Sequence, residues 1–128
     1  MVGMTAPFVF ITTHRIKPES RDEFMTVHRD YVHFVEESEP GMLGHFSYLS
    51  ADGTEVSLVQ VHTDAESADR HLEGIAPRLA TVGHLVENTA IEVYGNPGPT
   101  VRAALDRNRD AGVVVRVSNQ ALDGFSRS

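Results

Sequence analysis

Residues 41–74 read GMLGHFSYLSADGTEVSLVQVHTDAESADRHLEG and carry the clearest signals of secondary structure in the chain. Two runs rich in apolar residues flank Asp52-Gly53, a pair typical of a hairpin because glycine tolerates the positive φ that such turns need. The second run ends at His62, and Thr63 to Glu66 have the spacing of a capping box, which begins a helix. The stretch therefore predicts two antiparallel strands followed at once by a helix.

A strand and a helix precede this stretch, and further helix and strand follow it. Residues 7–16 are rich in β-branched and aromatic side chains, which is typical of a strand covered on both faces. Ser20 to Glu23 form a second capping box, and residues 24–35 carry apolar side chains at helical spacing. Beyond Gly74, Pro77 predicts the first turn of a separate helical piece. Residues 89–95 predict a fourth strand.

The predicted order is β-α-β-β-α-β, a ferredoxin-like fold of the α+β class. Right-handed crossovers place the first and third strands at the centre of an antiparallel sheet, with both helices on one face. We expect residues 1–99 to form this domain. Residues 100–128 form an extension with a short helix and a strand, packed on the same domain or on a partner subunit.

The sheet face opposite the helices is also predicted to be apolar. Two helices cover only one face, and an apolar sheet of this size is not expected to face water. We therefore predict a homodimer that packs sheet to sheet. The apolar strand residues that support it are Val9, Ile11, Leu43, Leu49, Val59, Val61, Ile91 and Val93.

The composition excludes several classes of partner. The chain of 128 residues has 18 acidic and 11 basic side chains and no basic cluster, so we expect no nucleic-acid partner. It has no run of the roughly 18–20 apolar residues that cross a bilayer, and its N-terminus lacks the basic start of an export signal, so we expect no membrane partner. The absence of cysteine agrees with a cytoplasmic location.

The junction between strand and helix carries a family signal. His71 follows His62 by nine residues, with a polar capping turn between them, and Pro77 comes shortly after. This register, together with the closing IEVYGNPGP, resembles the antibiotic biosynthesis monooxygenase family over about residues 8–98. The resemblance implies a dimeric α/β barrel. For some members it also implies oxidation of aromatic polyketides without metal or flavin, in a pocket between helices and sheet.

The chain departs from the family pattern at two positions. In many members of the family, tryptophan stands where this chain has His62 at the end of the strand. This chain has no tryptophan. The haem-degrading relatives also use an asparagine on the first strand, where this chain offers Thr12, Thr13 and His14. Both departures argue against haem degradation. The resemblance to the quinone-forming members implies that no cofactor is needed and that the ligand is a small aromatic molecule.

His71 is the candidate catalytic residue. It lies at the edge of an apolar helical stripe, between Ala68 and Ile75, from which a side chain reaches into a pocket. An imidazole with a pKa near ~6.5 accepts a phenolic proton at neutral pH. The alternative is a half-buried histidine bonded to a carbonyl group.

Five further residues are candidate substrate-binding groups. Phe24, His28 and Tyr31 share the apolar stripe of the first helix, and His14 and His62 lie on strands. The alternative for each is ordinary core packing. None of the seven histidines stands three or four residues from another, so no helical metal-binding pair exists and we predict no metal site.

Three functions remain open from the sequence. The first is a cofactor-independent monooxygenase that acts on an aromatic, polyketide-like small molecule. The second is a polyketide cyclase, in which acid–base groups guide ring closure without oxygen. The third is a dimer that binds a ligand or serves a structural role without catalysis.

Overall fold

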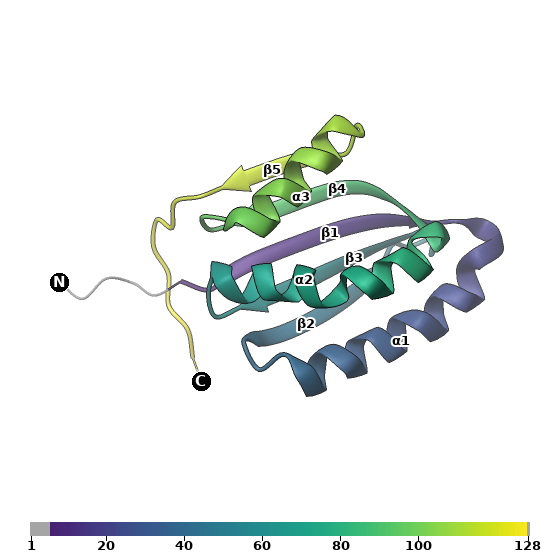
Figure 1. Ribbon diagram of the computed structural model, residues 1–128, viewed down its shortest axis with the longest axis horizontal. Helices are drawn as coiled ribbons and strands as arrows, with labels where there is room; N and C mark the ends of the chain where they lie inside the picture. Colours follow the sequence, from purple (N-terminus) through teal and green to yellow (C-terminus); the bar gives the residue numbers. More distant parts are fainter. Residues whose placement is uncertain (1–5, 128) are drawn as a thin grey trace.

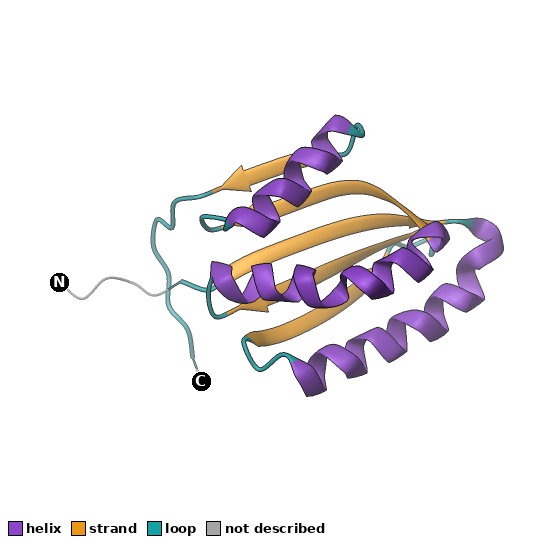
Figure 2. Ribbon diagram, viewed as in Figure 1, coloured by secondary structure: helices purple, strands orange, loops and turns teal. Residues whose placement is uncertain are grey.

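One five-stranded sheet carries three helices on a single face (Figures 1 and 2). The structure is a computed structural model, and it describes residues 6–127. Residues 1–5 of the predicted domain and Ser128 of the predicted extension lie outside this range. The strands are β1 Phe8–Ile16, β2 Met42–Leu49, β3 Glu55–His62, β4 Val86–Tyr94 and β5 Val114–Ser118. The helices are α1 Arg21–Ser38, α2 Ala65–Val82 and α3 Pro99–Asp110, with short 3-10 turns η1 Pro18–Ser20 and η2 Gly83–Leu85.

The strand order is β2-β3-β1-β4-β5, so β1 and β3 are inner strands as predicted. β1 pairs antiparallel with both β3 and β4, and β2 pairs antiparallel with β3. β5 adds to the edge parallel to β4, which makes the complete sheet mixed. The predicted ferredoxin-like α+β fold, with helices on one face, is confirmed.

The turn between β2 and β3 is the predicted hairpin. Gly53 has a φ of +72°, which few other residues adopt, and its N–H donates to the Ser50 carbonyl oxygen at 2.9 Å. The Asp52 carboxylate accepts from the Thr54 backbone N–H at 3.0 Å. These bonds fix the register of β3, whose alternate residues then face the helices.

Three details of the predicted helices are wrong. The N-cap of α2 is Asp64 and not Thr63, because its carboxylate accepts from the Ser67 N–H at 2.8 Å. Ser20 makes no capping bond, since η1 runs directly into α1. The separate helix expected at Pro77 is absent, and α2 continues to Val82. Packing of the apolar face of α2 against the sheet outweighs the local cost of the proline.

A register shift in β4 decides which of its side chains face the helices. The β1–β4 pairing changes between Thr13, opposite Ala90, and His14, opposite Asn88. Such a bulge re-aims the side chains beyond it. As a result Asn88 lies beside His14 on the helix-bearing face. Ile91, on the other side of the bulge, faces the helices too, although the two residues are three apart and would lie on opposite faces of a regular strand.

The C-terminal helix shares the core of the sheet. Val101 and Leu105 of α3 are buried in one cluster with Phe8 and Phe10 of β1. The Asp69 carboxylate of α2 accepts from the Val101 N–H at 2.9 Å and so holds the start of α3 against α2. The division of the chain at residue 99 stays a prediction. No helix among residues 6–127 is long and apolar enough to cross a membrane.

Candidate functional site

A cavity of about 600 Å³ lies between the helices and the sheet. Its lining comes from all three helices, from η2, and from β1, β3 and β4. Most of the wall is apolar, with Phe10, Leu58, Leu72, Ile75 and Ile91 among its residues. The volume falls in the range of about 300–1,000 Å³ that is usual for small-molecule sites.

Four of the predicted site residues line this cavity. They are His14 of β1 and Phe24, His28 and Tyr31 of α1. His62 and His71 do not line it, since both rings are wholly buried behind its wall. His71 therefore does not itself reach into the cavity, and its catalytic role stays a prediction.

Tyr31 connects the cavity to His71. The Tyr31 hydroxyl lies 3.0 Å from His71 Nε2, and His71 Nδ1 lies 2.7 Å from the Glu39 carboxylate. An ionised carboxylate only accepts, so the geometry fits a neutral imidazole that donates from Nδ1 and accepts the Tyr31 proton at Nε2. The three residues form a chain in which each polar atom has a partner.

Burial sets the protonation of this chain. It lowers the pKa of His71 from 6.5 to about 4, because the charged form of the ring is not hydrated in the interior and is therefore disfavoured. Burial, and then the Glu39 charge, raise the pKa of Tyr31 above its usual range, while Arg78 acts in the opposite direction. At neutral pH, therefore, Tyr31 keeps its proton and His71 is a neutral acceptor beside it.

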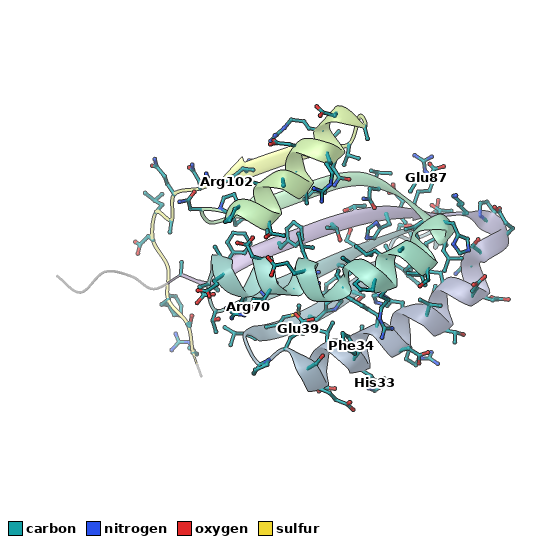
Figure 3. All side chains as sticks on the ribbon, in the orientation of Figure 1. His33, Phe34, Glu39, Arg70, Glu87 and Arg102 are labelled. Atoms are coloured by element: carbon teal, nitrogen blue, oxygen red, sulfur yellow. The ribbon has the colours of Figure 1, made fainter. Side chains whose placement is uncertain are left out.

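Glu39 connects the chain to the surface. Its side chain is 18% exposed, and it lines a second depression of about 340 Å³ together with Arg70. Figure 3 shows Glu39 beyond the end of α1, close to Arg70 of α2. The chain of Glu39, His71 and Tyr31 thus spans the layer between α1 and α2, from a solvent-facing depression to the inner cavity.

His62 has a full set of hydrogen bonds next to this chain. Its Nδ1 lies 2.8 Å from Ser67 Oγ, and its Nε2 lies 3.1 Å from Gln60 Oε1. Burial, and then the nearby His71, lower the pKa of His62 to about 4. With both nitrogens satisfied and no contact with the cavity, His62 serves to position Gln60, which does line the cavity.

His45 of β2 has no such partners. Both of its ring nitrogens are buried without a hydrogen bond among the described residues. Its ring lies 5.4 Å from the Tyr31 ring and 5.9 Å from the His28 ring, measured between centroids. His28 itself bonds through Nε2 to Ser47 Oγ at 2.6 Å. An unsatisfied buried ring of this kind costs stability.

A second polar group lies under α3. His14 Nδ1 is 2.6 Å from Asn88 Oδ1, and Asn88 Nδ2 donates to Asn108 Oδ1 at 3.0 Å. Burial lowers the pKa of His14, although its bond to Asn88 acts in the opposite direction. All three residues line the cavity, so its wall has polar groups at Tyr31 and again below α3.

Sequence reasoning missed several of these residues, and two of them carry a signal. Glu39 follows the end of α1, where the helix dipole disfavours an acidic side chain, so a carboxylate there invites a specific role. On the buried face of β3, Val56 and Leu58 are apolar and the next residue, Gln60, is polar. Asn88 and Asn108 carry no comparable signal, because a bulge and the packing of α3 place them.

The described residues give no sign of a metal centre. No group of three or more histidine, aspartate or glutamate side chains in residues 6–127 is placed to hold an ion. The absence of a metal and of any other cofactor stays a prediction from the sequence.

Comparison with known proteins identifies the family. Residues 7–76, more than half of the chain, match the family described as antibiotic biosynthesis monooxygenase. No curated protein matches the chain by sequence at a significant level. MupZ from Pseudomonas fluorescens has a similar structure, with a TM-score of 0.71, 20% identity and coverage of 95% of each chain.

Two further solved structures share the fold over a smaller part of this chain. Rv0793 from Mycobacterium tuberculosis gives a TM-score of 0.60 at 21% identity, covering 73% of this chain and 98% of that one. A conserved protein from Methanosarcina mazei Go1 gives 0.63 at 17% identity, covering 70% and 92%. At these identities the likeness shows the fold alone.

Proposed function

Because the chain belongs to the antibiotic biosynthesis monooxygenase family, we propose that it is a cofactor-independent monooxygenase acting on an aromatic, polyketide-like small molecule. One observation carries the proposal: Tyr31 lines the cavity, and its hydroxyl is backed by a neutral His71 at 3.0 Å. A ligand-binding protein without catalysis needs no proton acceptor behind its wall. The buried position of His71 therefore favours an enzyme.

The relay removes a proton from the bound substrate. A phenol or an acidic methylene group beside Tyr31 gives its proton to the tyrosine oxygen, as the Tyr31 proton moves to His71 Nε2. The imidazolium that forms is stabilised by the Glu39 carboxylate at 2.7 Å. The substrate remains as an electron-rich anion in an apolar cavity, the form that donates electrons to dioxygen.

The overall reaction needs no outside reductant. In an anthrone-type substrate the methylene carbon takes one oxygen atom as a carbonyl group. The second oxygen atom leaves as water with the two methylene hydrogens. The role of the protein is to orient the substrate, exclude water and move the proton, and the described side chains supply each of these functions.

Oxygen uptake tests this proposal. With a panel of anthrones and naphthols we expect the purified protein to consume oxygen, with a product heavier by one oxygen atom and lighter by two hydrogens. Labelled dioxygen is expected to place one labelled atom in the carbonyl group. A folded protein that consumes no oxygen with any member of the panel contradicts the proposal.

A polyketide cyclase is the second candidate, because the relay holds a proton donor and a proton acceptor in one chain. The same Tyr31 and His71 would guide an aldol closure without oxygen. The product mass separates the two functions, since ring closure adds no oxygen atom.

We also propose that the protein is a homodimer that packs through the helix-free face of the sheet. Phe46 and Tyr48 of β2 are 55% and 61% exposed on that face, beside half-buried Val59 and Val61 of β3. Such a continuous apolar surface marks an interface in soluble proteins. Dimeric assembly is also what family membership implies.

Sedimentation velocity tests the dimer. The wild-type protein is expected to sediment as a dimer at micromolar concentration, and Phe46→Glu is expected to shift it to the monomer because a carboxylate is then buried unpaired. Ala103→Glu, on the exposed surface of α3, is the matched charge control and is expected to leave the dimer intact. A wild-type monomer at these concentrations would contradict the proposal.

A further inference from the structure

The charge of the cavity lining is opposite in sign to that of the whole chain. The chain carries 18 acidic and 11 basic side chains. The lining contains Arg78 and Arg107 and, within residues 6–127, no aspartate or glutamate. A concave site with cationic groups and low-dielectric walls concentrates anions. The lining is therefore suited to an anionic ligand.

Arg107 belongs to a stripe of α3 that faces the cavity. Ala104, Asn108 and Ala111 share this face at helical spacing, and the two small alanines leave room beside the longer side chains. Arg107 is exposed and makes no ion pair with any described residue. Arg109, two residues on, pairs with Asp106 at 3.2 Å and does not line the cavity.

The two asparagines beside Arg107 offer further donors. Asn88 donates one amide N–H to Asn108 Oδ1 at 3.0 Å, and Asn108 donates one to the Ala104 carbonyl oxygen at 2.8 Å. Each amide has a second N–H that makes no hydrogen bond with a described residue. Asn88, Asn108 and Arg107 all line the cavity, so its wall holds two amide groups and a guanidinium, a set of donors that suits the two oxygens of a carboxylate.

We propose that the ligand carries a carboxylate on its aromatic body, and that Arg107, Asn88 and Asn108 bind this group below α3. The aromatic nature of the ligand is taken from the proposed function. The sheet order puts β1 between β3, which lies under Tyr31, and β4, which lies under α3. The carboxylate thus anchors one end of the ligand, the apolar wall covers its middle, and the reacting group is held at Tyr31.

A pair of naphthalene probes tests the anion site. Naphthalene-1-carboxylate and naphthalene-1-carboxamide have the same ring and nearly the same size but differ in charge. Isothermal titration at pH 7.5 in low salt is expected to give a Kd about tenfold lower for the carboxylate, the size of effect that a charge-assisted hydrogen bond gives. Added salt is expected to weaken the binding of the carboxylate probe and to leave the binding of the carboxamide unchanged.

Two matched arginine variants test whether Arg107 causes the preference for the carboxylate. Arg107→Gln is expected to abolish the preference for the carboxylate, while Arg109→Gln, the same change on the same turn, retains it. Equal affinities in the wild type, or an equal loss in both variants, overturn the carboxylate site and leave the proposed oxidation of neutral aromatic compounds standing. Failure of both probes to bind also overturns the site, and oxygen uptake then decides the proposed function on its own.

Discussion

Replacing Tyr31 with phenylalanine is expected to lower kcat for oxygen uptake by about 100-fold to 1,000-fold, the usual contribution of a positioned acid–base group. The ring is retained, so the cavity keeps its shape, but the path from substrate to His71 is broken. The hydroxyl lies 3.0 Å from His71 Nε2, and its loss is expected to cost folding stability about 1 kcal/mol. Substrate KM is expected to change little, because the hydroxyl acts on the proton and not on the aromatic body.

Tyr94→Phe is the matched control for this variant. Tyr94 also loses a bonded hydroxyl, since it donates to Glu92 Oε2 at 2.6 Å, but it does not line the cavity. Its activity is expected to equal that of the wild type. Equal activities for Tyr31→Phe and Tyr94→Phe would remove the relay from the mechanism.

Acid is expected to destabilise the protein strongly between pH 6.5 and pH 4. Burial lowers the pKa values of His62 and His71 from 6.5 to about 4, so the unfolded chain binds more protons than the folded chain in this window. The stability from these neutral rings is complete above pH 6.5 and is lost as pH falls to about 4. Each wholly buried ring accounts for on the order of 2–3 kcal/mol. Thermal unfolding followed by circular dichroism from pH 7.5 to pH 4.5 measures the effect, and a constant Tm contradicts it.

The variant His45→Phe tests the contribution of a single buried histidine to this pH dependence. His45 is a further ring whose pKa burial lowers to about 4, with His71 adding to the shift, and it bonds to no described residue through either nitrogen. Phenylalanine removes a titrating group without breaking a hydrogen bond. The variant is expected to be more stable than the wild type by on the order of 1 kcal/mol at neutral pH, and to lose less of its Tm in acid.

The fold was predictable because its signals are local. The Asp52-Gly53 turn predicts a hairpin, and the strand after it ends at His62 as predicted. Family register drew attention to His71, and helical spacing drew attention to Tyr31. Each of these signals needs only neighbouring residues or a single spacing.

The site was only partly predictable because it joins residues that are distant in sequence. Tyr31 and His71 are 40 residues apart, and Glu39 reaches His71 from 32 residues away. Their contact depends on how α1 and α2 pack, which no periodicity encodes. The polar group at Asn88 depends on a bulge in β4, and Arg107 depends on the packing of a helix that the family match over residues 7–76 does not include.

The protonation state of His71 shows most directly whether a proton can leave the cavity through Tyr31 towards a neutral imidazole. Long-range proton–nitrogen correlation spectra of ¹⁵N-histidine-labelled protein distinguish the two ring nitrogens, and His71→Gln assigns their signals. We expect that at pH 7 the proton is on Nδ1, which faces Glu39, and that Nε2 carries no proton and faces Tyr31. A ring protonated on both nitrogens, or on Nε2 alone, contradicts it, because Tyr31 would then have no acceptor.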